Sequence, residues 1–238
     1  MTKEVFYNDL TLVRWRLGQR KNEYMSYNFK YVPRSKYLPV KKELERLINA
    51  VQNEVREYFT FSFTYVGSTH RKLITEDLRG NVGYDFDVNI HVNDENEDYT
   101  AEEIRTKIFR AFNKFVKQFG YDYCEDSTRV LTIKRKDIQR SRIISSCDFA
   151  IVYDCKDGRQ QYIHFNKKQQ TYDWEFLPIS NMELEGKAEV IRNKGCWDEV
   201  RNLYLDKKNL NENPNKRSRS LYAETINEIY HRCVQKNC

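Results

Sequence analysis

The chain of 238 residues is long enough for one large domain or two small ones with a substantial buried core. Hydrophobic residues make up 39% and charged residues 32%, a polar but globular balance that 17 Tyr and 13 Phe support. No apolar stretch approaches the roughly 20 residues that cross a bilayer, and the segment after Met1 lacks the apolar core of a signal peptide. We therefore expect a soluble, cytoplasmic protein without a membrane partner.

Basic residues outnumber acidic residues by 41 to 35, which gives a formal net charge of +6. This excess is compatible with a polyanionic ligand but does not demonstrate one. The basic residues are concentrated in residues 134–142, at Lys207 and Lys208, and in residues 216–219. Each run is either a solvated loop or a surface that contacts phosphates.

The six cysteines show no C-x-x-C pair, so the pattern predicts reduced thiols without a metal. A structural zinc site would need ligands from distant positions to converge. The cysteines are Cys124, Cys147, Cys155, Cys196, Cys233 and Cys238.

The first third of the chain predicts two helices and a strand. A helix is expected over residues 8–28, and residues 31–35, which contain a proline, interrupt the pattern. A second helix is expected over residues 41–58, where apolar residues recur at helical spacing. The β-rich run of residues 59–66 follows, and a Gly-Ser turn ends it.

The middle of the chain predicts an irregular connection over residues 69–83 and then a strand over residues 84–92. Within this strand the apolar residues alternate with polar ones, so one face is expected to be buried. Asp85, Asp87 and His91 lie on the other face.

A helix is expected over residues 100–119, because Thr100 and Glu103 form the pattern of a capping box. Strands are then predicted over residues 129–134, 146–154 and 160–165, the last two joined by a tight turn, and helices over residues 196–207 and 220–235.

This order predicts an α+β fold, with a mixed β-sheet and flanking N- and C-terminal helices that form a cleft. We expect residues 41–178 to form the core, and residues 1–40 and 179–238 to form helical elements that pack across the cleft.

Asp85 and Asp87 are candidate metal ligands, because side chains two residues apart on a strand point to the same side. Close carboxylates repel each other unless a cation lies between them, and carboxylate oxygens suit Mg²⁺ or Mn²⁺. The alternative is an ordinary pair of solvent-facing carboxylates.

Gly67 and Ser68 are candidate phosphate ligands, because glycine lets a phosphate approach the backbone and serine donates a hydroxyl. The alternative is a plain turn. Asp148 lies within an apolar, β-branched run, where an acidic side chain needs a partner. That partner is a metal shared with Asp85 and Asp87, or a basic side chain.

Taken together, these residues resemble the nucleotidyltransferase superfamily that includes DNA polymerase β. The resemblance implies that Asp85 and Asp87 hold two metal ions, Mg²⁺ or Mn²⁺. It implies that Asp148 binds one of them and helps to deprotonate an acceptor hydroxyl. It also implies that Gly67 and Ser68 hold the triphosphate of a nucleotide substrate.

The C-terminal part looks like the branch that contains oligoadenylate synthetases, cyclic GMP-AMP synthase and bacterial cyclic-oligonucleotide synthases. In this resemblance Lys207 (or Lys208) and Ser220 contact the β- and γ-phosphates. The alternatives are lysines that complement a helix C-terminus and a serine N-cap. Two departures leave the product open: the connection from Ser68 to Asp85 is longer than usual, and the chain is short for such a synthase.

The function expected from the resemblance is transfer of a nucleoside monophosphate to an acceptor hydroxyl with release of pyrophosphate. A second nucleotide as acceptor, giving a cyclic or linear oligonucleotide, is favoured. The alternatives are RNA held by residues 134–142, a protein or small-molecule hydroxyl as in toxin-like members, and a catalytically silent module that binds nucleotides or nucleic acid.

Overall fold

The computed structural model describes residues 27–94, 96–177 and 182–235. The chain divides into two compact units, the sheet unit of Lys30–Glu185 and the helical unit of Met1–Phe29 with Gly186–Cys238. The helix predicted over residues 8–28 lies outside the described residues except at its last two positions.

A mixed β-sheet organises the sheet unit, with strand order β2-β4-β7-β6-β5, followed by β8 against β7 and β9 against β8. β4 and β7 run parallel, and the other pairs run antiparallel. A parallel pair needs a crossover connection, and the connection from β4 to β7 contains a helix and two strands. The strands are β2 (Thr60–Val66), β4 (Tyr84–Asn93), β5 (Cys124–Asp126), β6 (Leu131–Asp137), β7 (Arg142–Asp154), β8 (Gln160–Asn166) and β9 (Thr171–Phe176).

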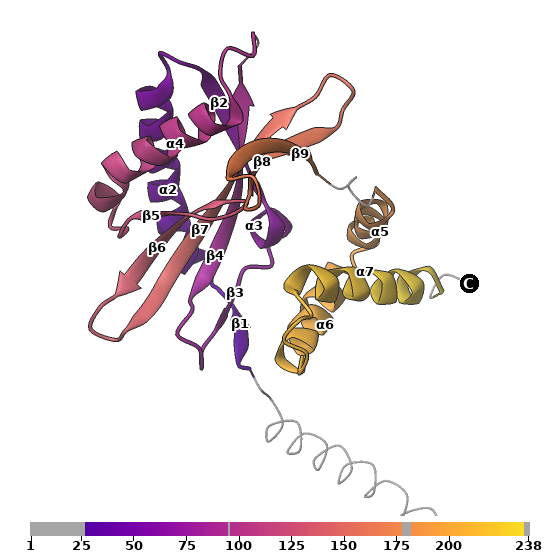
Figure 1. The fold of residues 1–238 in the computed structure, drawn as a ribbon. Coiled ribbons are helices and arrows are strands. Elements are labelled where there is room, and N and C mark those ends of the chain that lie inside the picture. Colours follow the sequence, from indigo (N-terminus) through magenta and orange to yellow (C-terminus); the bar gives the residue numbers. More distant parts are fainter. Residues whose placement is uncertain (1–26, 95, 178–181, 236–238) are drawn as a thin grey trace, which may run out of the picture. The chain divides into compact units, whose positions relative to one another are not determined.

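Two helices, α2 (Arg34–Val55) and α4 (Ala101–Phe115), lie on the same side of this sheet (Figure 1). The buried face of β4 packs there as predicted, with Tyr84, Phe86, Val88, Ile90 and Val92 in the core. The sheet with flanking helices confirms the predicted fold class.

Several elements differ from prediction. β6 and β7 extend beyond their predicted bounds, and the strands β5 and β9 and the helix Met182–Asn193 were not predicted. α2 begins at Arg34 rather than residue 41, and Pro39 lies inside it without ending it. The connection over residues 69–83 is not irregular throughout: it contains the end of α3 (Gly67–Arg71) and β3 (Thr75–Asp77), which pairs with β1 (Phe29–Tyr31). The helix predicted to residue 119 is α up to Phe115 and then continues as the 3₁₀ turn η1 (Val116–Phe119).

The capping box at the start of α4 is present, with the Glu103 amide donating to the Thr100 hydroxyl and the Thr100 amide donating to the Glu103 carboxylate. Further along α4, Arg105 is 1% exposed. Its guanidinium donates to the Asp126 carboxylate at 2.5 and 2.9 Å and to the carbonyl oxygens of Ser127 and Val130. This buried cation therefore ties α4 to β5 and to the turn before β6.

The helical unit contains α6 (Trp197–Asn209), α7 (Ser218–Gln235) and most of α5 (Met182–Asn193). The unit begins within α5, at Gly186. α6 packs against α7, where the rings of Tyr204 and Tyr222 meet edge to face. Among the described residues, every helix is too short or too polar to cross a membrane.

We predict that Arg105→Met lowers the free energy of unfolding by about 2–4 kcal/mol, because it keeps most of the aliphatic packing but leaves polar partners without their donor. Urea denaturation measures the change. Arg110→Met is the matched control, since Arg110 is exposed on the same helix and a surface change there shifts stability by about 0.5 kcal/mol or less. Equal effects of the two substitutions would contradict the role given to Arg105.

Candidate active site

The three predicted aspartates lie on the open face of the sheet, opposite the helices. Asp85 and Asp87 lie on β4, and Asp148 lies on the neighbouring strand β7. In the register of this parallel pair, Asp87 is directly opposite Asp148, and Asp85 is opposite Ser146. Adjacent strands lie about 4.8 Å apart, so the fold brings the three carboxyl groups to one place.

The electrostatics of this place disfavour three negative charges. Burial, and after it the nearby Asp85 and Asp148 carboxylates, raises the pKa of Asp87 to about 7, while Arg71 opposes the change. Burial also raises the pKa of Asp148, although the Thr132 hydroxyl donates to its Oδ1 at 2.6 Å and favours the ionised form. The carboxylates therefore need positive charge nearby in order to ionise together.

These residues fit a hard divalent cation, because they offer only carboxylate oxygens and their charges repel one another. The oxygen atoms of the three aspartates do not all lie within 4.8 Å of one another. Among the described residues, a group of three ligands that meets this distance is found at Cys196, Glu199 and Cys233. Mutual repulsion of the aspartates favours this separation.

Gly67 and Ser68 do not form a plain turn but begin the short helix α3, directly after β2. Gly67 has φ of +59°, and a Cβ atom built on it would lie 2.2 Å from Asp87 Oδ2. The hydroxyls of Ser68 and Thr69 are buried and have no hydrogen-bond partner among the described residues. Two hydroxyl donors without acceptors thus follow directly after the glycine that approaches Asp87, and a phosphate is a group that could accept from them. Sequence reasoning missed Thr69.

Lys207, Lys208 and Ser220 belong to the helical unit, so their contact with a triphosphate stays a prediction. Lys207 Nζ lies 2.9 Å from Glu228 and 4.0 Å from Glu224. Lys208 Nζ lies 3.9 Å from the centre of the Phe29 ring. Ser220 is exposed within the first turn of α7.

The basic stretch of residues 134–142 lies on β6, on the turn after it and at the start of β7, and four of its cations are paired with carboxylates. This pairing leaves less free positive charge for a nucleic-acid backbone than the sequence suggested. The pairs are Lys134–Glu125, Arg135–Glu43, Lys136–Asp122 and Arg140–Asp137.

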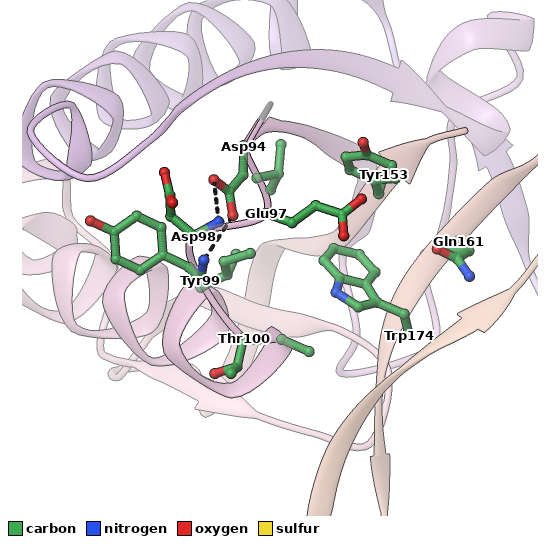
Figure 2. A pocket seen from close by; sticks show the side chains of 11 residues that line it. Asp94, Glu97, Asp98, Tyr99, Thr100, Tyr153, Gln161 and Trp174 are labelled. Atoms are coloured by element: carbon green, nitrogen blue, oxygen red, sulfur yellow. Dashed lines mark hydrogen bonds between the residues drawn. The ribbon is translucent and has the colours of Figure 1, made fainter. Parts of the chain in front are cut away.

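A separate cavity of about 360 Å³ lies near the C-terminal end of β4 and the start of α4 (Figure 2). Its wall combines the acidic residues Asp94 and Glu97 with the aromatic rings of Tyr153 and Trp174. The Asp94 carboxylate already accepts hydrogen bonds from the backbone amides of Asp98 and Tyr99. None of the predicted site residues lines this cavity.

The fold is similar to that of solved structures of DncV. The DncV cyclic AMP-GMP synthase of Vibrio cholerae in complex with nonhydrolyzable GTP superposes with a TM-score of 0.52 and 13% identity, over 95% of this chain and 67% of that one. GTP-bound Vibrio cholerae DncV has a TM-score of 0.51 and 15% identity, over 83% of this chain and 52% of that one. Escherichia coli DncV with 3'-deoxy GTP has a TM-score of 0.50 and 15% identity, over 85% of this chain and 54% of that one.

This likeness is one of fold, since the identities are low. The chain spans about half the length of the latter two structures. No protein-family model matches the sequence, and no curated protein matches it either.

We predict that Gly67→Ala is more damaging than Gly158→Ala. Both glycines have positive φ, but a Cβ on Gly158 meets nothing within 4 Å. Gly158→Ala therefore carries only the left-handed backbone cost of about 1–2 kcal/mol, whereas Gly67→Ala also displaces the Asp87 carboxylate and is expected to cost about 1–3 kcal/mol more. Chemical denaturation at pH 6 compares the two, and equal losses would contradict the close approach.

We also predict a pH-dependent gain from Asp87→Asn. The folded-state pKa of Asp87 is near 7 against an ordinary value of 3.8, so ionisation costs the folded state stability as pH rises from about 4 to 7. Asparagine avoids this penalty. With divalent metal chelated, the variant should be more stable than the parent by about 1–3 kcal/mol at pH 8 and equal to it at pH 4.

Denaturation curves recorded at several pH values measure this difference. The control is Asp198→Asn, because Asp198 is exposed on α6. Its replacement should give no gain in the free energy of unfolding that increases with pH. Added Mg²⁺ should stabilise the parent at pH 8 more than the Asp87 variant. A difference that is constant with pH would refute the buried-charge assignment.

Proposed function

We propose that the protein is a metal-dependent nucleotidyltransferase that moves a nucleoside monophosphate from a nucleoside triphosphate to an acceptor hydroxyl and releases pyrophosphate. The observation that carries the proposal is the meeting of Asp85, Asp87 and Asp148 on one sheet face, beside the unpaired hydroxyls that follow Gly67. In this proposal residues 41–178 are the catalytic core, and residues 1–40 and 179–238 pack across its cleft. Its substrates and its reduced thiols suit the cytoplasm.

Asp85, Asp87 and Asp148 would hold Mg²⁺ or Mn²⁺. When bound, these ions neutralise charge on the triphosphate and stabilise the departing pyrophosphate. The raised pKa of Asp87 supports this assignment, because a carboxylate that ionises reluctantly alone becomes a strong ligand for a cation that cancels the repulsion.

The remaining side chains position the substrates. Asp148 receives the proton of the acceptor hydroxyl as that oxygen attacks the α-phosphorus in line. The Thr132 hydroxyl donates to Asp148 Oδ1, which holds this carboxylate in one orientation. Ser68 donates its hydroxyl to the triphosphate, and the absence of a side chain at Gly67 leaves room for it.

Lys207 and Ser220 are proposed to contact the β- and γ-phosphates. The Lys207 ammonium lies between Glu224 and Glu228, so it would have to exchange these carboxylates for phosphate oxygens. A triphosphate carries more charge than one carboxylate, which favours that exchange.

The favoured acceptor is a second nucleotide, which gives a cyclic or linear oligonucleotide. DncV, named as a cyclic AMP-GMP synthase, shares the fold, which supports this choice. The carboxylates paired with residues 134–142 weigh against RNA held at that stretch.

The test is incubation of the full chain with mixed radiolabelled nucleoside triphosphates and Mg²⁺ or Mn²⁺, with and without RNA. We expect metal-dependent pyrophosphate release and a labelled product that resists phosphatase if it is cyclic. The double substitution Asp85→Ala with Asp87→Ala should lower the rate by at least about 10³-fold, because it removes several kcal/mol of transition-state stabilisation.

Asp154→Asn serves as the matched control. Asp154 is another acidic residue on β7, but it pairs with His91 and Gln160, and its replacement should leave the rate within about twofold. Pyrophosphate release that persists in the double variant would overturn the assignment. Nucleotide binding without turnover in the parent would favour the silent binding module, and label in RNA would identify RNA as the acceptor.

A further inference from the structure

Three potential metal ligands converge in the helical unit, far along the chain from the aspartates. The Sγ atoms of Cys196 and Cys233 and a carboxylate oxygen of Glu199 all lie within 4.8 Å of one another. Cys233 is 2% exposed, and the other two side chains are half-buried. The two cysteines are not joined by a disulfide.

The backbone at the corner between α5 and α6 fixes two of these ligands. The Cys196 amide donates to the Ile191 carbonyl oxygen at 3.0 Å, which closes the end of α5, and Gly195 adopts φ of +71° to make the corner. Glu199 follows one turn later, and its amide donates to the Cys196 carbonyl oxygen at 3.2 Å. Residues three apart on a helix face the same way.

The third ligand arrives from the last turn of α7. Lys194 Nζ donates to the carbonyl oxygen of Cys233 at 3.4 Å, so the same corner also holds the end of α7. The cluster therefore joins two backbone segments, the α5–α6 corner and the last turn of α7.

We propose that Cys196, Glu199 and Cys233 bind a zinc-class divalent cation, with a water molecule as fourth ligand. Thiolates select borderline-soft ions such as Zn²⁺ over Mg²⁺. In a tetrahedral zinc site, Zn–S bonds of about 2.3 Å place two sulfur atoms about 3.8 Å apart. Ligand atoms already within 4.8 Å need only a small closure to reach this geometry.

Binding releases the two thiol protons to solvent. The Cys196 thiol lies 3.7 Å from the Lys194 carbonyl oxygen, and this weak contact is exchanged for a metal bond. Two thiolates, one carboxylate and one divalent ion together carry a charge of about −1 by formal counting, and the nearby Lys194 ammonium offsets it.

The site and the proposed aspartate site would take different metals because their donor atoms differ. Sulfur donors hold zinc in the helical unit, while oxygen donors in the sheet unit suit Mg²⁺. The zinc would act structurally, by tying α5 and α6 to α7. Failure of one proposal therefore leaves the other untouched.

The experiment uses the full chain, reduced and stripped of metal, and titrates it with Co²⁺ in the presence of excess Mg²⁺. The absorption spectrum of bound Co²⁺ shows whether sulfur atoms coordinate it and whether its geometry is tetrahedral. We expect a near-ultraviolet sulfur-to-cobalt charge-transfer band and tetrahedral d–d bands that saturate at one equivalent, and added Zn²⁺ should bleach both. Zinc should also raise the melting temperature of the stripped protein by several degrees.

Cys196→Ser tests the half-buried ligand without disturbing the core, and it should lower the charge-transfer band by at least about half, because one of the two thiolates is removed. Cys233→Ser should do the same, with circular dichroism as a check on folding. Glu199→Gln should weaken cobalt binding at least about 10-fold, as loss of a supporting group commonly does. Cys155→Ser, at a half-buried cysteine in the sheet unit, is the control and should keep the band.

The proposal is overturned if the reduced parent shows no sulfur-to-cobalt band, or if Cys196→Ser leaves the band at full intensity. It is also overturned if mass spectrometry of anaerobically purified protein finds Cys196 and Cys233 joined, since the pair would then be a disulfide. Loss of the band in the Cys155 control would place the metal elsewhere.

Discussion

The repulsion among three neighbouring carboxyl groups, two of them half-buried, is the constraint around which the sheet unit is arranged. Parallel pairing of β4 with β7 sets Asp87 directly against Asp148, and burial raises the pKa of both. Neighbouring residues accommodate these carboxylates. Thr132 donates to one carboxylate, and the position beside Asp87 admits only glycine. A sheet packed by two helices holds these groups rigidly. A loop would lose more conformational entropy to hold them in the same place.

Local patterns made much of this arrangement predictable. Alternation along residues 84–92 indicated which side of the strand is buried, and the structure confirms it. The capping box at Thr100 is equally local, and it is also confirmed. The sequence did not reveal that β4 and β7 are adjacent and parallel, because pairing between distant strands leaves no signature in either strand alone. Only the resemblance to a known superfamily implied that Asp148 lies near Asp85 and Asp87.

Other features were missed because they depend on contacts at long range. Gly67 and Ser68 suggested a turn, yet they open a helix whose first residue packs against a side chain on another strand. Cysteine spacing gave no hint that Cys196 and Cys233 meet, because their proximity depends on how α6 packs on α7. Basic runs suggested a polyanion surface, but three of the four carboxylates that pair with residues 134–142 lie outside this stretch. Charge counts cannot register such pairing.

The parallel pairing of β4 and β7 also bears on how the protein is made. The segment between these strands contains α4, β5 and β6, so Asp87 and Asp148 meet only after all of them have been synthesised. Contacts between distant residues form late, because loop-closure entropy opposes them. A chain still emerging from the ribosome would therefore display Asp85 and Asp87 without their partner. The synthesis of β7 thus sets the earliest moment at which the site can assemble.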